Sequence, residues 1–231
     1  MGEQLTITTP DGSFSAYVAR PGRSPAPAVV VIQEIFGVNA VMRQFTDALA
    51  AAGFLSVCPD LFWRIEPGIN LTDQTEPEMK RAFELFGLCD VDLAVGDIAA
   101  TIAQVRADPA CSGKVGAVGF CLGGLLAFLT ATRTDCDASV SYYGVGLEAR
   151  VGETNKLGAP LMLHIAELDR FVPPEAQAII QRALKNHPQI EVHTYPGRDH
   201  AFARPGGENY DAGDARLAAE RTLAFFQQHL G

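Results

Sequence analysis

A glycine-rich turn between a strand and a helix constrains the fold of this 231-residue chain more than any other feature. The apolar run at residues 115–118 is followed by Gly119-Phe120-Cys121-Leu122-Gly123 and then by a second apolar segment at residues 124–132. In a Gly-x-Cys-x-Gly turn the backbone segments approach so closely that a Cβ atom at either glycine would clash. The pattern therefore predicts a sharp strand–turn–helix unit that presents Cys121 at the head of a helix.

Strands and helices alternate along most of the chain, because short apolar runs and stretches of helical periodicity follow one another between turn signals. We expect strands at residues 28–32, 54–58, 115–118, 139–143, 161–165 and 190–195, and helices at residues 40–52, 77–86, 91–107, 124–132, 174–185 and 215–229. Strands separated by helices pair in parallel through right-handed crossovers. The chain therefore predicts an α/β fold with a doubly wound, mostly parallel sheet, in one domain over residues 1–231.

The N-terminus departs from this alternation. Two β-prone runs, at residues 3–9 and 14–20, flank the turn signal Pro10-Asp11-Gly12. Such a pattern is typical of an antiparallel hairpin. We expect this hairpin to form one edge of the sheet.

The charge balance narrows the range of partners. Lys and Arg number 18 and Asp and Glu number 27, which gives a net charge of −9. Such a surface repels phosphate backbones and anionic lipid, so neither nucleic acid nor a membrane is expected as a partner. The sequence has no signal-peptide pattern and five cysteines without paired spacing, which predicts a cytoplasmic protein with reduced thiols. Neither metal-ligand spacing nor a dinucleotide-binding pattern occurs, so no metal and no cofactor are expected.

Cys121 is the candidate nucleophile. A helix N-terminus favours the thiolate form of a cysteine, and the backbone N–H of Leu122 would be placed to receive an oxyanion. The alternative is that Cys121 is a small buried hydrophobic residue in a tight turn, since free cysteine is among the most buried residue types. We favour the catalytic interpretation because an acid and a histidine follow in suitable loops.

Asp169 and His200 are the candidates for the rest of a catalytic triad. Asp169 lies in the loop after the strand at residues 161–165, where Glu167 is its rival, and either acid could instead cap a helix. His200 lies after the last strand and before the C-terminal helix. The chain order Cys, Asp, His is the order of α/β hydrolases and differs from that of chymotrypsin or subtilisin.

Glu34 is an anomaly, because it places a charge directly after the apolar run at residues 28–32. A carboxylate beside Cys121 would disfavour the thiolate, so Glu34 could control when the thiol ionises. It could instead pair with an arginine. The same loop is expected to supply a second oxyanion donor, the backbone N–H of Ile35.

Three segments together resemble the dienelactone hydrolase (carboxymethylenebutenolidase) family of α/β hydrolases, and the resemblance spans nearly the whole chain. They are Gln33-Glu34-Ile35-Phe36-Gly37, Gly119-Phe120-Cys121-Leu122-Gly123-Gly124 and Asp199-His200-Ala201-Phe202-Ala203-Arg204. The resemblance implies hydrolysis of dienelactones to maleylacetate-type products in catechol or chlorocatechol degradation. It also implies that Arg81 and Arg204 hold a substrate carboxylate and that Glu34 accepts the thiol proton when substrate binds.

The expected substrate pocket departs from the family pattern in one region. Leu85 and Leu88 stand where the resemblance leads us to expect tyrosine or tryptophan. Phe36, Tyr143 and Phe171 remain candidates to line the pocket, although aromatic residues near strand ends are also ordinary core residues.

The predicted reaction is attack by the Cys121 sulfur on a lactone or ester carbonyl, followed by hydrolysis of a thioester by water that His200 activates. The expected partner is therefore a small lactone or ester that carries a carboxylate. Two alternatives stay open: a general carboxylesterase or thioesterase on the same scaffold, and a non-catalytic protein with Cys121 as a redox-sensing thiol. The second alternative does not explain the acid and the histidine, because a sensor thiol needs no orienting acid.

Overall fold

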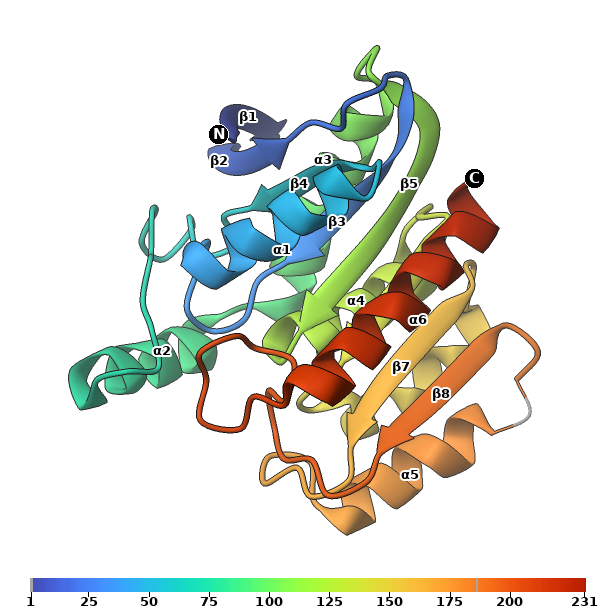
Figure 1. Ribbon diagram of the computed structural model, residues 1–231. Helices are drawn as coiled ribbons and strands as arrows, with labels where there is room; N and C mark the ends of the chain where they lie inside the picture. The colour runs from blue at the N-terminus through green and yellow to red at the C-terminus, as the bar shows by residue number, and fades with distance from the viewer. Residues whose placement is uncertain (1, 186) are drawn as a thin grey trace.

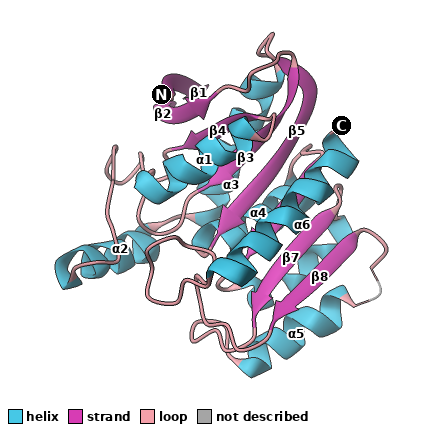
Figure 2. Cartoon of the chain, viewed as in Figure 1, coloured by secondary structure: helices cyan, strands magenta, loops and turns pink. Residues whose placement is uncertain are grey.

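An eight-stranded sheet forms the centre of the molecule (Figures 1 and 2), and the computed structural model describes residues 2–185 and 187–231. The strand order is β1-β2-β4-β3-β5-β6-β7-β8. The strands are β1 Glu3–Thr9, β2 Gly12–Ala19, β3 Ala26–Ile32, β4 Leu55–Pro59, β5 Cys111–Phe120, β6 Ala138–Tyr142, β7 Leu161–Ala166 and β8 Ile190–Tyr195. The β1–β2 and β2–β4 pairs are antiparallel and the remaining pairs are parallel. The predicted α/β fold with its N-terminal hairpin is thereby confirmed.

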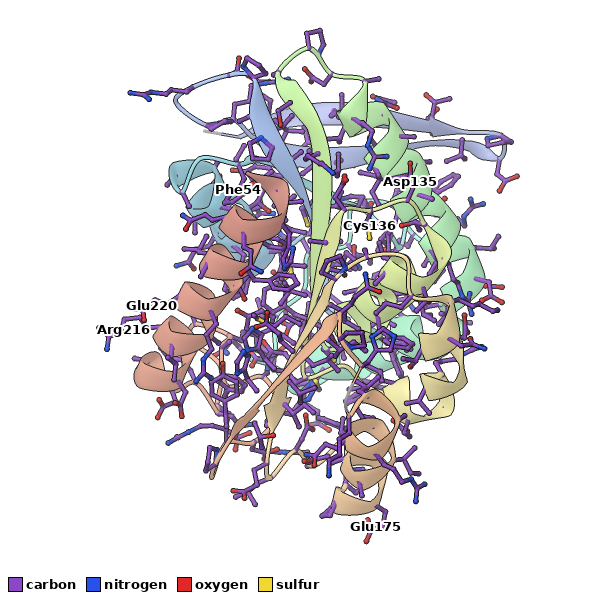
Figure 3. The ribbon with its side chains drawn as sticks, turned by 90° about the vertical axis from the view of Figure 1, so that its right-hand side faces the viewer. Phe54, Asp135, Cys136, Glu175, Arg216 and Glu220 are labelled. Carbon is purple, nitrogen blue, oxygen red and sulfur yellow. The ribbon has the colours of Figure 1, made fainter. Side chains whose placement is uncertain are left out.

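Helices cover both faces of the sheet. They are α1 Ala40–Ala51, α2 Glu76–Leu88, α3 Val91–Arg106, α4 Leu122–Arg133, α5 Pro174–Leu184 and α6 Ala212–Leu230. Helices α1 and α6 lie on one face and α3 and α4 on the other, as Figure 3 shows with Arg216 and Glu220 pointing outward from α6. Helix α2 projects from the body near the carboxyl end of β5 (Figure 1). Within the described residues, no helix combines the length and the apolar character needed to cross a bilayer.

Two boundaries differ from the sequence prediction by more than two residues. Strand β5 begins at Cys111 rather than at residue 115, because residues 112–114 are exposed and interrupt the apolar signal. Helix α6 begins at Ala212 rather than at residue 215, because the side chain of Asp211 caps it by accepting a hydrogen bond from the Asp214 backbone N–H. Such capping extends a helix beyond its apolar periodicity.

The central strands are buried on both faces, which explains their unbroken apolar sequences. Residues Ala28 to Ile32 of β3 are fully buried, and Val31 pairs in register with Val118 of β5. Parallel pairing brings the carboxyl ends of β3, β5, β6, β7 and β8 to one edge of the sheet. In open α/β sheets the functional site lies at this edge.

Candidate active site

Cys121 lies at the tip of the turn between β5 and α4. Its backbone has φ 58° and ψ −116°, a conformation that residues other than glycine rarely adopt. The turn is possible because a Cβ atom on Gly119 would overlap the carbonyl group of Gly123, and one on Gly123 would overlap the carbonyl oxygen of Ile32. Only glycine fits at positions 119 and 123, two residues before and two residues after Cys121, and these glycines allow the sharp turn from β5 into α4.

Backbone strain is concentrated around this cysteine. Among the described residues, the non-glycine residues with positive φ are Cys121, Tyr143 and Ala201. Tyr143 follows β6, and Ala201 follows His200 in the loop after β8. Strained conformations persist where the surrounding structure fixes them, and they cluster at functional sites.

His200 and Asp169 form a buried hydrogen-bonded pair. The Nδ1 atom of His200 lies 2.9 Å from Oδ2 and 3.1 Å from Oδ1 of Asp169. Asp169 also accepts a hydrogen bond from the backbone N–H of Phe171 at 2.9 Å, and the rings of Phe171 and Tyr143 pack edge-on against the imidazole. The rival acid, Glu167, instead accepts from the backbone N–H of Gly197. The geometry therefore favours Asp169 as the acid that orients the histidine.

The electrostatic environment of His200 includes Cys121. Burial lowers the pKa of His200, but the electrostatic interaction with Cys121 and the hydrogen bonds that the imidazole donates to Asp169 and to Cys121 outweigh burial and raise the pKa to about 10. Away from this site, burial raises the pKa of the Cys58 and Cys136 thiols to about 12. The geometry thus places an imidazole with a raised pKa beside Cys121.

Arg204 joins two carboxylates beside this pair. Its Nη1 lies 3.2 Å from Oε2 of Glu34 and its Nη2 lies 3.0 Å from Oδ2 of Asp73. The guanidinium also lies over the ring of Phe36, 5.2 Å from the ring centroid. Burial lowers the pKa of Arg204, but Glu34 and Asp73 outweigh burial and raise it. The alternative that Glu34 pairs with an arginine is therefore realised in the structure.

Three buried polar atoms in this region have no hydrogen-bond partner. They are Oε1 of Glu34, Nε of Arg204 and the hydroxyl of Tyr143. Burial raises the pKa of Tyr143 well above its usual value, with Glu34 adding to the rise and Arg204 opposing it, so the three groups interact electrostatically. Buried polar groups normally find partners, and of these three residues Arg204 also lines a cavity where a bound molecule could supply one.

A cavity of about 80 Å³ opens onto Cys121 and His200. Its walls are mostly apolar and aromatic, and Arg204 is the cation among them. They comprise Ile35, Phe36, Met79, Phe83, Phe86, Val145 and Phe171. At the mouth the rings of Phe83 and Phe171 lie 6.2 Å apart, and both are more than two-fifths exposed. A planar, conjugated molecule would therefore find aromatic contacts on its way to the thiol.

Comparison with known proteins agrees with this geometry. The model of the dienelactone hydrolase family matches residues 14–230. This chain belongs to the dienelactone hydrolase family. A protein of Azospirillum brasilense is 53% identical over 225 residues, which are 96% of each chain. The carboxymethylenebutenolidase of Pseudomonas putida is 42% identical over 224 residues, with 96% of this chain and 95% of that protein covered. A solved structure from Klebsiella pneumoniae superposes with a TM-score of 0.85 at 26% identity, covering 99% of this chain and 98% of that one.

These relationships show that the protein is an ester hydrolase that acts on a small lactone or ester. The residues predicted to carry the chemistry meet at one place: Cys121, His200, Arg204, Ile35, Phe36 and Phe171 line one cavity. Leu122 is the first residue of α4, so its backbone N–H has no acceptor within the helix. The roles of Leu122 and Ile35 as oxyanion donors stay predictions.

Arg81 does not join Arg204 in this member of the family. Its guanidinium pairs with Glu66 at 2.7 Å and with Glu84 at 3.0 Å on the surface. The reason is helix geometry, because Arg81 is two residues from Met79 and two from Phe83, which both face the cavity. At 3.6 residues per turn, a separation of two residues places a side chain on nearly the opposite side of a helix.

The same geometry corrects the expectation for Leu85 and Leu88. Leu85 is fully buried and Leu88 is largely exposed, and neither lines the cavity. The hydrolase presents Phe83 and Phe86 there instead, so the expected aromatic contacts exist at positions that we did not select. Tyr143 also lies outside the cavity wall and supports His200 from behind, with ring centroids 5.1 Å apart.

Sequence reasoning missed five groups at the site of this hydrolase: Val145, Asp73, Met79, Phe83 and Phe86. The last three follow the i, i+4, i+7 spacing of one helix face, a signal that was available in the sequence. Asp73 lies in the loop before α2 and gave no local signal. Among the described residues, no group of three or more His, Cys, Asp or Glu side chains is arranged to hold a metal ion.

Proposed function

We propose that this protein opens a dienelactone (4-carboxymethylenebut-2-en-4-olide) to maleylacetate by thiol attack and a thioester intermediate. The observation that carries the proposal is the position of His200, hydrogen-bonded to Asp169 and in contact with Cys121 at the strained turn. The names of the curated relatives from Pseudomonas putida and Cupriavidus pinatubonensis, carboxymethylenebutenolidases both, support the choice of substrate. Catechol or chlorocatechol degradation in the cytoplasm is the setting that this reaction and the free thiols favour.

In the first half of the reaction the sulfur of Cys121 forms a bond to the lactone carbonyl carbon. The carbonyl oxygen becomes an oxyanion, which the N–H groups of Leu122 and Ile35 stabilise. When the oxyanion collapses, the ring C–O bond breaks, and the enol oxygen that leaves takes a proton from His200. The products of this half are a thioester on Cys121 and an opened enol, which converts to the ketone.

In the second half His200 removes a proton from water, and the resulting hydroxide attacks the thioester carbonyl. The C–S bond breaks, the carboxylic acid is released, and the sulfur is left as a thiolate beside protonated His200. Asp169 keeps the imidazole in the orientation that both halves need. The ring opening consumes one water molecule per turnover.

Glu34 and Arg204 support a more specific role within this proposal. The substrate carboxylate would bind the Arg204 guanidinium in competition with Glu34, and the released Glu34 would accept the proton of the Cys121 thiol. Guanidinium groups suit carboxylates because two parallel N–H donors match two oxygens. The unpartnered Oε1 of Glu34 is the atom available for that proton.

A second candidate is hydrolysis of neutral esters or thioesters. The observation that favours it is the charge balance of the cavity, where Arg204 is already paired with two carboxylates and Arg81 faces away. An aromatic, largely apolar cavity would accept a neutral aryl ester without a partner for a carboxylate.

A substrate panel and an intermediate-trapping experiment test the proposal together. The panel contains cis- and trans-dienelactone, their chlorinated analogues and a neutral aryl ester. We expect a dienelactone to have the highest kcat/KM, and mass spectrometry of acid-quenched enzyme to show an acyl adduct on the peptide that contains Cys121. Cys121→Ala should abolish turnover while leaving the circular dichroism spectrum unchanged. A folded Cys121→Ala protein that retains most activity would overturn the proposal, and a neutral ester as best substrate would favour the second candidate.

A further inference from the structure

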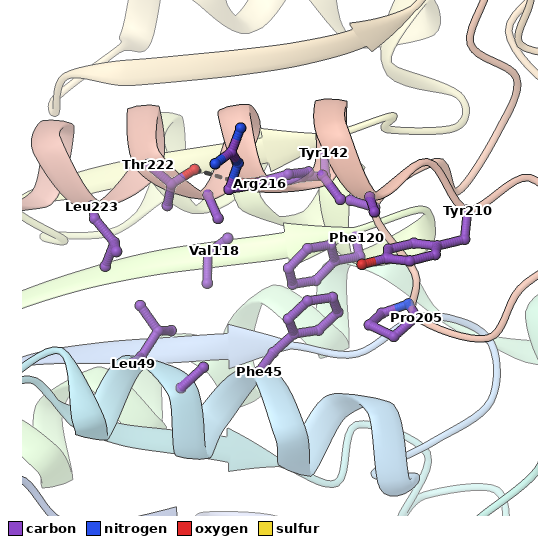
Figure 4. Close-up of a pocket in the computed structure, with 15 residues that line it drawn as sticks. Phe45, Leu49, Val118, Phe120, Tyr142, Pro205, Tyr210, Arg216, Thr222 and Leu223 are labelled. Atoms are coloured by element: carbon purple, nitrogen blue, oxygen red, sulfur yellow. Dashed lines mark hydrogen bonds between the residues drawn. The ribbon is translucent and has the colours of Figure 1, made fainter.

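A second cavity lies on the face of the sheet opposite to α3 and α4, between helices α1 and α6 (Figure 4). Its volume is about 270 Å³. Val118 and Phe120 of β5 form its floor, Phe45 and Leu49 of α1 form one wall, and α6 forms the other wall. Figure 4 shows aliphatic side chains such as Leu49 toward one end and aromatic side chains such as Phe45 and Phe120 toward the other.

The cavity exists because α6 presents alanine where a larger side chain would fill the space. Ala215 and Ala219 are one helical turn apart and both face the cavity. The stacked rings of Phe45 and Phe120, with centroids 4.4 Å apart, fix the aromatic end of the floor. The walls are therefore mostly apolar and aromatic, which is the usual construction of a small-molecule site.

A cation stands at the rim of this apolar space. Arg216 of α6 is among the residues that border the cavity, and its side chain is 79% exposed. Its acidic neighbour, Glu220, lies 3.9 Å away and is also mostly exposed. An exposed pair at this separation contributes little stability, so the guanidinium can exchange Glu220 for another anion at small cost.

We propose that this cavity binds a monocarboxylate with an apolar body of about eight to ten carbon atoms, whose carboxylate pairs with Arg216. The size follows from volume, because an apolar cavity of about 150 Å³ holds one benzene molecule. The charge follows from Arg216. The proposal goes beyond the proposed function, because this site lies apart from the cavity that contains Cys121.

Several residues that line this second cavity are direct sequence neighbours of active-site residues, so a molecule bound here would affect the active site through the backbone. Phe120 directly precedes Cys121, and Tyr142, which also lines this second cavity, directly precedes Tyr143. Ala203 and Pro205 lie on the cavity wall and flank Arg204. Neighbouring residues of a strand point to opposite faces of a sheet, so a shift of the lining side chains moves the backbone that carries the active-site groups. We therefore expect the bound carboxylate to change turnover.

Calorimetric titration of octanoate into enzyme with Cys121 alkylated by iodoacetamide tests the proposal, because alkylation blocks the first cavity. One molecule of octanoate should bind per chain. Arg216→Gln should weaken octanoate about two- to fivefold and leave 1-octanol unchanged, as expected for loss of an exposed charge pair. Ala219→Phe should fill the cavity and abolish binding of both compounds, whereas Leu217→Phe, at an exposed α6 position, serves as the matched control.

Turnover of a neutral aryl ester by unmodified enzyme supplies the second measurement. Saturating octanoate should change kcat in the wild type and in Leu217→Phe, but not in Ala219→Phe. If Ala219→Phe does not fold, the proposal is tested by the affinities of Arg216→Gln and the wild type for octanoate and for 1-octanol. The proposal would be overturned if alkylation of Cys121 abolished octanoate binding. It would also be overturned if neither Arg216→Gln nor Ala219→Phe changed the affinity for octanoate. Unchanged turnover at saturation, or a dimer that buries this face and excludes octanoate, would overturn it as well.

Discussion

The Nη1 atom of Arg204 lies 3.2 Å from Oε2 of Glu34, although the two residues are 170 positions apart in the chain. Glu34 is 1% exposed and Arg204 13%, so the pair is shielded from water. Removing one partner of such a pair leaves the other charge buried and uncompensated. Substitutions at the two positions therefore have different consequences, because Asp73 continues to pair with Arg204 when Glu34 is neutralised.

Glu34→Gln should increase the rate at which Cys121 is alkylated in resting enzyme near neutral pH, and should reduce turnover. Removing the carboxylate removes repulsion of the thiolate, and it also removes the proposed proton acceptor. Alkylation by iodoacetamide can be followed by peptide mass spectrometry. Cys58 and Cys136 serve as internal controls, because burial raises the pKa of each to about 12. An alkylation rate at Cys121 that is equal in both proteins across the pH range would reject the coupling.

Arg204→Ala and Arg81→Ala should differ sharply. Loss of a charge-assisted contact to a buried carboxylate costs roughly 1.5–3 kcal/mol, so Arg204→Ala should lower kcat/KM for a dienelactone about 10- to 150-fold. Turnover of a neutral aryl ester should be affected much less. Arg81→Ala removes only surface ion pairs with Glu66 and Glu84, so its kcat/KM should stay within about twofold of the wild type.

These two variants also distinguish the candidate functions. Equal losses on both substrates in Arg204→Ala would indicate structural damage to the cavity, and thermal unfolding would reveal it. No loss on either substrate would favour the neutral esterase. A large, dienelactone-specific loss in Arg81→Ala would show that α2 moves when substrate binds.

Gly119→Ala should destabilise the fold by more than about 2 kcal/mol, because its Cβ atom would overlap the backbone of Gly123 at the turn that holds Cys121. Gly96→Ala is the matched control. Gly96 lies within α3 with open space around the added methyl group, so the substitution should be neutral or stabilise by about 0.5–1 kcal/mol. Urea unfolding of the two variants measures both changes. Equal stabilities would contradict the tight-turn explanation.

The sequence was sufficient to predict the fold, and it also led us to expect Cys121, Asp169 and His200 at one edge of the sheet, where the structure places them. Their catalytic roles stay predictions. Each of these residues follows a strand, and the ends of parallel strands meet at one edge regardless of the details of packing. The wall of the cavity was less predictable. It depends on where α2 lies. The spacing of Met79, Phe83 and Phe86 marks one face of this helix, but it does not say that this face meets the cavity, which follows from the tertiary contact between Phe83 and Phe171.

The placement of Arg81 shows the same limit. The family resemblance implied that Arg81 holds a substrate carboxylate, but a difference of two positions along a helix is enough to move a side chain from the cavity to the surface. Asp73 could not be found either, because its role arises from a contact with Arg204 across 131 positions of sequence. Long-range ion pairs leave no periodic trace in the sequence.

Cys121→Ala should lower the pKa of His200. In the wild type, burial lowers this pKa, and the charge of Cys121 together with the contacts to Asp169 and Cys121 raises it to about 10, well above the usual 6.5. The imidazole should therefore stay protonated as the pH rises past 6.5 and lose its proton only near pH 10. When alanine replaces the cysteine, only Asp169 opposes burial, so the proton should be lost at a lower pH.

Histidine ring signals followed by NMR across pH 5–11 measure this change. His193, whose pKa is lowered chiefly by burial, should titrate identically in both proteins. An unchanged His200 titration in the variant would show that Cys121 and His200 do not form an ion pair, and that the thiol must be activated only after substrate binds.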